Sequence, residues 1–454
     1  MRPSIDARLA GGRAGVQQVR ELVTVALDAM ADAAPDGPAP RGGPAAVAAA
    51  MDVDLLPEQG IGDAAALDRL ARLLVAGSVD PTHPWCAAHL HGPPLAVAAA
   101  ADLVGSILNP SMDSWDQAPI ASELERALTA VLARLCFPDE PADALITSGG
   151  TESNLLGLLL AREVNGGVNG AVQPICGRNA HHSITRAAWL LGLPAPLLVD
   201  CADGRLRVDH LTELLAGLDR PAAVFATAGT TDTGAVDPIA EIRAAAPEAW
   251  LHVDGAYGGA ALFSDRLAPL LDGVARADSI SLDLHKFGWQ PIAAGVLATR
   301  RPLAALDTKA DYLNAADDTD AGLPDLLGRS LRTSRRPDAF KIAVTLLALG
   351  RTGIGSLVEQ CCDVAGEVSD AVDAHPALEL WGRPTLSTVL FRPAGADDTH
   401  VAGIRRRLLE EGTAVLGRAT IDGDVWLKLT LLRPNASAAD YTGLLALVAG
   451  GARS

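Results

Sequence analysis

The sequence predicts an α/β protein built on a mostly parallel β-sheet that helices cover on both faces. From Ala144 onward, apolar strand-like runs alternate with helical patterns. Several of these runs end in small or polar residues, as in ALITSGGTESN and WLHVDGAYGG. Of the 454 residues, 49% are hydrophobic, which is enough to bury a sheet between two layers of helices. Because ligands bind such sheets at the carboxyl ends of the strands, we expect a site at these strand endings.

The composition disfavours several classes of partner. The net charge is −18, so we expect neither nucleic acid nor an anionic membrane surface to bind. The longest apolar stretch, Leu95 to Leu108, is interrupted by Asp102 and is too short to span a bilayer. The six cysteines show no C-x-x-C spacing, and the N-terminal residues do not read as a secretory signal. We therefore expect a cytoplasmic protein with free thiols.

Three regions follow from the patterning along the chain. Residues 1–80 read as helices joined by Pro/Gly-rich stretches, a segment that we expect to pack on a partner subunit. Residues 81–349 carry the alternating strands and helices of a large domain. Within them, the acidic segment DYLNAADDTDAGLPDLLG interrupts the pattern and is typical of a mobile lid. Residues 350–454 predict a smaller α+β domain.

The most informative stretch is SISLDLHKFGWQP, with Lys286 near its centre. A lysine among small and apolar residues is disposed to be neutral, and a neutral amine can form a Schiff base with an aldehyde. Asp254 ends the preceding strand pattern, and its apolar flanks would make an unpaired charge there costly. This pairing suits pyridoxal phosphate, since the lysine binds the aldehyde carbon and the carboxylate keeps the ring nitrogen protonated. The alternative for Asp254 is an ordinary acid in a solvent-facing loop.

SGGTESN joins a strand to a helix and predicts a phosphate site. Gly150 lets the backbone approach a ligand closely, Thr151 offers a hydroxyl, and the helix N-terminus favours an anion. An ordinary glycine turn before a helix remains the alternative. The motif is not a P-loop, because no Gly-Lys-Ser/Thr follows it, and no G-x-G-x-x-G fingerprint occurs at the other strand ends.

A histidine pair, His181 and His182, follows the next strand. His181 is placed to stack on a flat cofactor ring and to donate to a substrate carboxylate, while a purely structural loop histidine is the alternative. A metal site with His83, His89 and His91 is disfavoured, because no carboxylate or thiol completes a ligand set at the usual spacing. We therefore predict no metal.

The remaining strand ends supply further candidates for the cofactor. Thr230, in ATAGTTDTGAVDP, is placed to hydrogen-bond either Asp254 or the cofactor phenol oxygen, or else belongs to a plain tight turn. His285, next to the lysine, is a candidate for the phosphate. Asp283 is a candidate for ordering that turn.

Three residues away from the strand ends are candidates for substrate contacts. His91 and Trp115 lie early in the chain, and Trp115 is equally compatible with plain packing. Arg335, beside the lid segment, is a candidate anchor for a substrate carboxylate or for a loop, although arginine pairs of this kind are usually solvated.

Taken in order, these motifs resemble the group II pyridoxal-phosphate decarboxylases of fold type I. The motifs that carry the resemblance include TSGGTESN, NAHHS, TAGTTDTGAVDPI, HVDGAYGGA and SLDLHKFGWQP. HLHGPP, SMDSWDQAP, LRTSRRPDAFK and LGRATIDGDVWLKLTLLRP look closest to the bacterial branch that acts on 2,4-diaminobutyrate, lysine and related diamino acids. The resemblance covers nearly the whole chain beyond residue 80.

This resemblance implies a large domain with a mostly parallel seven-stranded sheet, and a homodimer with its active site at the subunit interface. It implies that Lys286 forms the Schiff base, that Asp254 holds the ring nitrogen and that His181 stacks on the ring. The other cofactor contacts that it implies are Gly150, Thr151, Thr230, Ala256 and His285. The implied reaction is decarboxylation of an L-amino acid, first a diamino acid such as 2,4-diaminobutyrate, ornithine or lysine, to the amine and carbon dioxide.

The lid segment departs from the family pattern. Related sequences usually carry a tyrosine there, which protonates the carbanion after carbon dioxide leaves, but Leu323 stands where that tyrosine is expected. Tyr312 falls at the start of the loop, in a position that we interpret as structural. Either His181 or water donates the proton, or the reaction ends in oxidative deamination to an aldehyde. A decarboxylase of an acidic, aromatic or aliphatic amino acid is a further alternative, and so is a non-enzymatic binding protein with the same fold.

Overall fold

The computed structural model describes residues 8–167, 172–307 and 316–450. The chain divides into two compact units. One contains residues 94–365 and 384–388, and the other contains the remaining N-terminal and C-terminal residues. The three domains predicted from the sequence, with boundaries after residues 80 and 349, remain a prediction.

The larger unit is organised around a seven-stranded sheet of order β1-β9-β8-β7-β6-β2-β3. β8, β7, β6, β2 and β3 are parallel neighbours, whereas β9 is antiparallel to both β8 and β1. The strands of the sheet are β1 (Asp143–Thr147), β2 (Gln173–Gly177), β3 (Leu197–Val199), β6 (Ala222–Thr227), β7 (Trp250–Gly255), β8 (Ser279–Asp283) and β9 (Gly295–Thr299). β2, β6, β7, β8 and β9 are buried along their whole length, as expected when both faces are covered. The predicted mostly parallel α/β sheet is confirmed.

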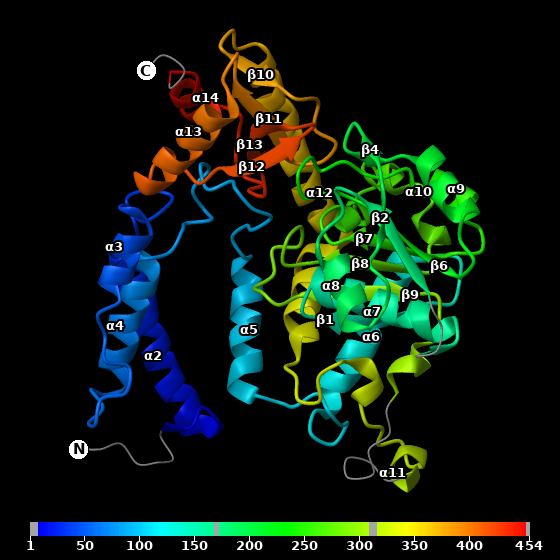
Figure 1. Cartoon of the computed structure of the whole chain (residues 1–454). Helices are drawn as coiled ribbons and strands as arrows, with labels where there is room; N and C mark the ends of the chain where they lie inside the picture. The colour runs from blue at the N-terminus through cyan, green and yellow to red at the C-terminus, as the bar shows by residue number, and fades with distance from the viewer. Residues whose placement is uncertain (1–7, 168–171, 308–315, 451–454) are drawn as a thin grey trace. The chain divides into compact units, whose positions relative to one another are not determined.

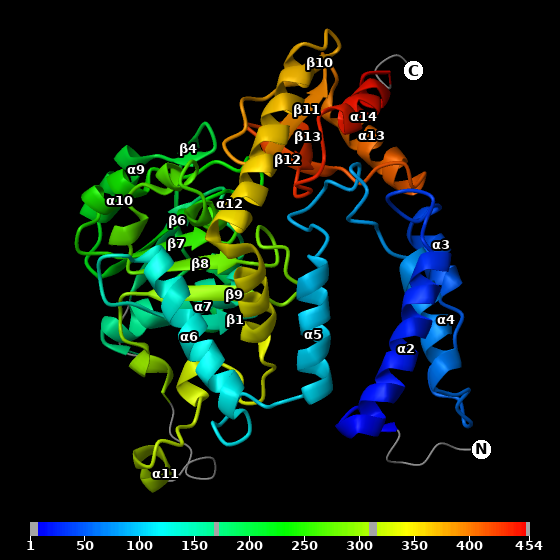
Figure 2. The same cartoon turned by 180° about the vertical axis from the view of Figure 1, so that it is seen from behind.

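Helices cover this sheet on both faces. α7 packs on β7, β8 and β9, and α8 packs on α7, while α6 contacts β1, β9 and the 3-10 helix η2. α7 and α8 lie in front of the sheet in Figure 1, and α6 lies in front of it in the reversed view of Figure 2. The α-helices of the unit that precede α12 are α5 (Ala96–Leu108), α6 (Pro119–Cys136), α7 (Gly150–Val164), α8 (Ser183–Leu190), α9 (Val208–Ala216), α10 (Ile239–Ala245) and α11 (Ala316–Asp320), and the 3-10 helix that contacts α6 is η2 (Gly258–Phe263). A short hairpin of β4 (Cys201–Ala202) and β5 (Arg205–Leu206) follows β3.

α12 (Asp338–Asp373) is the longest helix and continues from the larger unit into the smaller one. It is broken at Gly350, whose backbone φ of +66° is one that residues with a Cβ rarely adopt. Within the described residues, α12 is the one helix long and apolar enough to cross a membrane by length and composition. Ile342, Ile354 and Val358 on this helix are nevertheless fully buried, as in the core helix of a globular domain.

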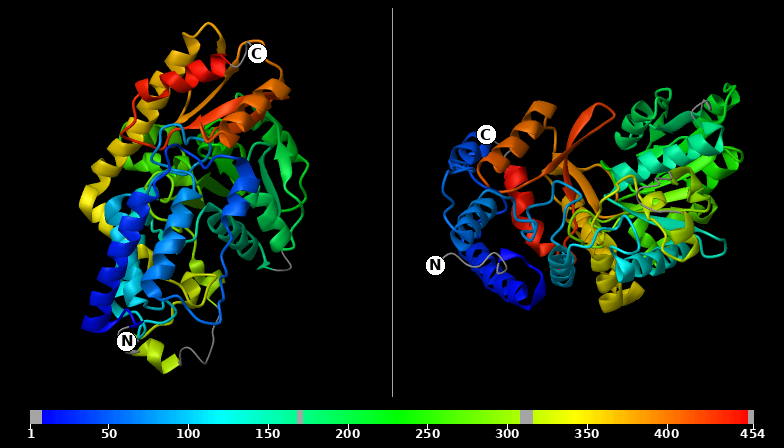
Figure 3. Two further views of the ribbon diagram at one scale, coloured as in Figure 1. Left: turned by 90° about the vertical axis from the view of Figure 1, so that its left-hand side faces the viewer. Right: turned by 90° about the horizontal axis from the view of Figure 1, so that it is seen from below.

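The smaller unit combines N-terminal helices with a C-terminal sheet. α2 (Gly12–Asp32) and α4 (Asp63–Ala76) pack side by side, with α3 (Gly43–Ala50) between them in sequence (Figure 3). The sheet has the order β10-β11-β13-β12. Its elements are β10 (Leu378–Leu380), β11 (Thr388–Pro393), α13 (Asp398–Glu410), β12 (Gly417–Ile421), β13 (Asp424–Thr430) and α14 (Ala439–Gly450). The predicted small α+β domain at the C-terminal end is confirmed.

The segment interpreted as a lid is only partly within the described residues. Tyr312 lies outside them, whereas Ala316–Asp320 form α11. The end of the segment is attached to the loop before α6, because the N–H of Trp115 donates to Pro324 and the N–H of Leu326 donates to Asp113. An isolated β-bridge between Ser114 and Asp325 lies between these two bonds.

Candidate active site

The register of the sheet brings the predicted strand endings together. Asp254, at the end of β7, is the neighbour of Ser281 on β8 and of Thr227 on β6. Farther along the same edge, Gly295 at the start of β9 pairs with both Asp283 and Thr147. Because β9 runs against its neighbours, its first residue meets their last ones, so the SGG turn lies beside the turn that carries Lys286.

Asp254 is buried and surrounded by neutral donors. Asp254 is 4% exposed. Oδ2 accepts a hydrogen bond from Asn154 Nδ2 at 2.8 Å, and Oδ1 accepts from the N–H of Ala256 at 3.1 Å and the hydroxyl of Ser281 at 3.3 Å. In the part of the chain that the structure describes, no lysine or arginine forms an ion pair with Asp254. A buried carboxylate arranged in this way is ready for a cationic ligand.

Lys286 lies directly after β8 and faces the last residue of that strand. Its Nζ is 3.0 Å from Asp283 Oδ2, and Nε2 of His285 is 3.5 Å from the same oxygen. The other oxygen, Asp283 Oδ1, is buried and has no hydrogen-bond partner within the described residues. Burial lowers the pKa of His285, while the Asp283 carboxylate acts in the opposite direction. Asp283 therefore orders the lysine turn, as the sequence suggested.

The glycine turn before α7 is shaped for close approach. A Cβ on Gly149 would lie 3.0 Å from His285, and one on Gly150 would lie 2.7 Å from the Cβ of Ala256 and 3.3 Å from Asp283. Four of the predicted elements therefore meet around one small volume: the SGG turn, the end of β7, Asp283 and His285. Thr151 lies in the first turn of α7 and is exposed. With Ser148 and Arg332 it lines a cavity of about 320 Å³.

His181 precedes α8 and belongs to the same group of side chains. The charges of Asp254, Asp283 and Lys286 all act on its imidazole. Burial lowers the pKa of His181, Lys286 lowers it further, and the Asp254 and Asp283 carboxylates oppose this. Its Nδ1 is 2.8 Å from the Ser183 hydroxyl and also accepts the Ser183 backbone N–H at 3.3 Å. His182 occupies the N-cap position of α8, and the Ser183 hydroxyl bonds His181 and Asn154.

Thr230 and Arg335 each have partners within the chain that match one of the alternatives left open by the sequence. The Thr230 hydroxyl is 2.7 Å from the Thr233 hydroxyl and accepts a hydrogen bond from the N–H of Ala235. These bonds within its own turn, and not a bond to Asp254, position Thr230. Arg335 is buried, and its two terminal nitrogens donate to the Glu125 carboxylate at 2.7 and 2.6 Å. Of the two alternatives for Arg335, the structure has the loop anchor and not the substrate anchor, because Glu125 on α6 already uses both terminal nitrogens in a bidentate ion pair.

The two other substrate candidates keep the status of predictions. Trp115 is half-buried in the loop that bonds the end of the lid segment. His91 is exposed and belongs to the smaller unit. No cluster of three or more metal-ligating side chains occurs within residues 8–167, 172–307 and 316–450.

Known proteins match this chain over most of its length. The model of the pyridoxal-dependent decarboxylase conserved domain matches residues 59–394. L-2,4-diaminobutyrate decarboxylase of Rhizobium meliloti (strain 1021) is 43% identical over 403 residues, covering 85% of this chain and 81% of the relative. The enzyme of the same name from Acinetobacter baumannii is 33% identical, covering 86% and 84%.

The chain belongs to the pyridoxal-dependent decarboxylase family. A solved structure agrees: the glutamate decarboxylase domain of diaminobutyrate-pyruvate transaminase and L-2,4-diaminobutyrate decarboxylase from Vibrio parahaemolyticus. It superposes with a TM-score of 0.87 at 31% identity, covering 99% of both chains. The fold is that of the fold type I enzymes, the cofactor is pyridoxal phosphate and the protein is an amino-acid decarboxylase.

The geometry of this decarboxylase site fits pyridoxal phosphate. Asp254 has only neutral donors, which leaves its charge for a protonated ring nitrogen. The Lys286 amine lies 3.0 Å from the Asp283 carboxylate, whose other oxygen has no partner within the described residues. The N-terminus of α7 supplies backbone N–H groups toward which a phosphate is attracted.

Sequence reasoning missed the buried side chains behind this decarboxylase site. Asn154, His252 and Ser281 are at most 1% exposed, and Asn154 links Asp254 to Ser183. One signal was present, since His252 is two residues before Asp254 on a strand and must share its face. Asn154 carried no such signal, because its position on α7 becomes meaningful only where α7 crosses β7.

Proposed function

We propose that this enzyme decarboxylates an L-diamino acid, with L-2,4-diaminobutyrate as the first candidate, to the diamine and carbon dioxide. The observation that carries the proposal is the 43% identity to a decarboxylase of that name over 85% of the chain. The solved protein from Vibrio parahaemolyticus, whose name includes the same activity, supports it. Ornithine and lysine are the next candidates.

Each residue of the site has a role in the proposed reaction. When bound, pyridoxal phosphate supplies an electron-accepting ring for the electrons of the broken Cα–carboxylate bond. Asp254 would hold the proton on the ring nitrogen, and its burial keeps water from competing for that bond. Gly150, Thr151 and the N-terminus of α7 would hold the phosphate, with His285 beside them.

Lys286 would bind the cofactor covalently, and its amine would afterwards be free to hold or move a proton at Nζ. Asp283 keeps this amine directed into the site. His181 would lie on one face of the ring, and its imidazole is the group that we assign to proton transfer, because Leu323 has no transferable hydrogen. The assignment of these roles to individual residues is part of the proposal.

The leucine at position 323, where related sequences carry a tyrosine, also favours a second candidate reaction. Without a lid tyrosine, oxygen-consuming decarboxylation and deamination to an aldehyde competes with amine formation. The two reactions differ in their products, since the second releases ammonia and hydrogen peroxide.

A product assay tests the proposed function. Purified enzyme with pyridoxal phosphate is supplied with a panel of diamino, acidic, aromatic and aliphatic amino acids, and carbon dioxide, amine, ammonia and peroxide are measured together. We expect the highest carbon dioxide release with 2,4-diaminobutyrate and equal amounts of amine. Stoichiometric peroxide would replace the first proposal by the second, and a clear preference for an acidic or aromatic amino acid would overturn the diamino-acid assignment.

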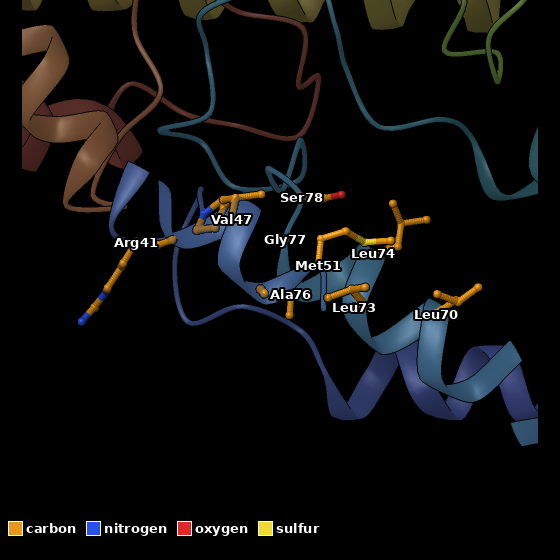
Figure 4. Close-up of a pocket in the computed structure, with 12 residues that line it drawn as sticks. Arg41, Val47, Met51, Leu70, Leu73, Leu74, Ala76, Gly77 and Ser78 are labelled. Atoms are coloured by element: carbon orange, nitrogen blue, oxygen red, sulfur yellow. The ribbon is translucent and has the colours of Figure 1, made fainter. Parts of the chain in front are cut away.

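We also propose that the enzyme is a cytoplasmic homodimer with its active sites at the interface. The six cysteines are free, as expected in a reducing compartment. The helices α3 and α4 form an apolar groove of about 640 Å³ (Figure 4). Val47, Met51, Leu70, Leu73 and Leu74 line the groove, and Leu74 is 70% exposed. A surface of this kind suits a second copy of the chain.

The oligomeric state tests this part of the proposal. Light scattering on the purified enzyme should give twice the chain mass, and Leu74→Asp should shift the protein toward the monomer. Ile61→Asp, which replaces another exposed apolar side chain that does not line the groove, is the matched control. A wild-type monomer with full activity would overturn the proposed dimer.

A further inference from the structure

A hydrogen-bond chain runs from buried Asp254 through two buried residues to half-buried His181. Asn154 Nδ2 is 2.8 Å from Asp254 Oδ2 and 2.9 Å from the Ser183 hydroxyl, and that hydroxyl is 2.8 Å from Nδ1 of His181. Asn154 and Ser183 are each 1% exposed. The chain joins three elements, because these residues come from β7, α7 and the start of α8.

The direction of each bond follows from the carboxylate at one end. An ionised carboxylate only accepts, so Asn154 must turn its NH₂ group toward Asp254. The second hydrogen of that group then points to the Ser183 oxygen, which accepts it. The Ser183 hydroxyl hydrogen is thereby left to donate to Nδ1 of His181. The Ser183 backbone N–H donates to the same nitrogen at 3.3 Å, a longer and weaker bond than the 2.8 Å contact of the hydroxyl.

A second arm fixes Asn154 from behind. Nε2 of His252 is 2.9 Å from the Asn154 carbonyl oxygen, and Nδ1 of His252 is 2.8 Å from the Ser279 hydroxyl. Burial lowers the pKa of His252 to about 4, so its ring is neutral and carries one hydrogen at neutral pH. With Nε2–H donating to Asn154 and the Ser279 hydroxyl donating to Nδ1, each of these polar atoms has a partner of the right kind. The Asn154 amide therefore cannot flip without breaking three buried hydrogen bonds, to Asp254, Ser183 and His252.

We infer that Asn154 and Ser183 are positioning residues that hold His181 as the tautomer with its hydrogen on Nε2. In this arrangement Asp254 has two roles. It would act on the ring nitrogen of the cofactor and, through the hydrogen-bond chain of Asn154 and Ser183, it would also decide which nitrogen of His181 carries the proton. The Nε2 hydrogen is the one left for a ligand, because both donors from Ser183 occupy Nδ1. The charged or titratable groups that act on the His181 ring are His182, Asp254, Asp283 and Lys286.

This inference deepens the proposed function, in which His181 transfers a proton, and it also has a consequence independent of any substrate. The ¹⁵N signals of a histidine ring distinguish the Nε2–H tautomer, the Nδ1–H tautomer and the cation. The experiment uses full-length protein labelled with ¹⁵N-histidine, with and without pyridoxal phosphate. The chain has ten histidines, and the signal that disappears in His181→Gln identifies His181.

We expect wild-type His181 to show the neutral Nε2–H pattern near pH 7. Ser183→Ala should move the signal toward a mixture of tautomers, and Ser183→Thr, which keeps the hydroxyl, should restore it. Asn154→Leu should change the His181 signal and also shift the visible absorption band of the bound cofactor, because Asp254 loses a donor. In the decarboxylation assay, Ser183→Ala should lower kcat about 10-fold or more and alter the pH profile, with KM nearly unchanged.

The matched control is Ser153→Ala. Ser153 lies next to Asn154 on the same helix and is fully buried. Its hydroxyl bonds Thr147 and Val296 and takes no part in the hydrogen bonds between Asp254 and His181. It should lower the melting temperature about as much as Ser183→Ala and leave the His181 signal unchanged. A wild-type Nδ1–H tautomer, or a His181 signal that Ser183→Ala does not move, would overturn the inference. Because the labelled protein needs no substrate, a wrong substrate assignment would leave this measurement valid.

Discussion

Two buried aspartates at opposite edges of one sheet have opposite surroundings. Asp278, immediately before β8, is 1% exposed and forms ion pairs with Arg243 at 3.2 Å and Arg301 at 2.7 Å. Asp254, at the end of β7, is 4% exposed and has only neutral donors. The first lies at the amino edge of the parallel strands and the second at their carboxyl edge.

The difference separates a structural acid from a functional one. A buried carboxylate needs a compensating positive charge, and Asp278 has two from its own chain. At Asp254 the chain supplies neutral hydrogen-bond donors, and we propose that the cofactor ring supplies the positive charge. Removing Asp254 should therefore change the chemistry, whereas removing Asp278 should change the stability.

The largest effect is expected for Asp254→Ala. Without the carboxylate the ring nitrogen is no longer held protonated, and we expect kcat to fall about 10³-fold or more. Carbon dioxide release with saturating cofactor measures this, and the reduced and digested protein should still carry cofactor on Lys286. A retained decarboxylation rate would show that Asp254 does not hold the ring nitrogen.

Asp278→Asn should give the converse result. Neutralising this carboxylate leaves two arginines without their partner, and we expect the free energy of unfolding to fall by about 3 kcal/mol. Urea unfolding followed by circular dichroism measures the loss. The kcat of the folded enzyme should stay within about 3-fold of wild type. A large fall in kcat without loss of stability would remove the distinction between the two aspartates.

His252→Gln tests the buried arm behind Asp254 through its pH dependence. The pKa of His252 is about 4 in the folded chain and near its ordinary 6.5 when unfolded, so the unfolded state binds more protons between these values. Stability should therefore fall as the pH drops from about 6.5 toward 4, and His252→Gln should make this loss smaller by about 2 kcal/mol. Unfolding at pH 7 and pH 4.5 measures the difference, with His375→Gln as the control. Equal pH dependence in wild type and variant would contradict the assignment.

The smallest effect is expected at the exposed acids of α11. Asp317, Asp318 and Asp320 are solvated, and replacing all three with Asn should change the unfolding free energy by less than about 0.5 kcal/mol. We expect KM for 2,4-diaminobutyrate to stay within about 2-fold, because exposed charges are screened. Steady-state kinetics at low and moderate salt measures this. A large, salt-dependent rise in KM would instead show that these acids attract the cationic substrate.

The chemistry-bearing residues were accessible from the sequence because their local context is unusual. Lys286 and Asp254 stand at the ends of apolar runs, where a charge is costly unless it has a task. Sequence reasoning was less successful where a polar residue has a distant partner. Arg335 looked like a surface arginine, and only the packing against α6 shows that Glu125 binds it. Asn154 lies 100 residues from Asp254 along the chain, a separation that no local pattern spans.

By itself the sequence indicated the α/β class, the alternation of strands and helices and the cofactor, and it singled out Lys286 and Asp254 as candidates to hold that cofactor. These are encoded in short patterns, since periodicity and turn residues act over a few positions. The tertiary structure decided which donors surround each buried carboxylate, and hence which aspartate is paired internally and which is left for a ligand. It also decided that the chain from Asp254 ends at His181, because hydrogen-bond partners on separate elements are fixed only by how those elements pack.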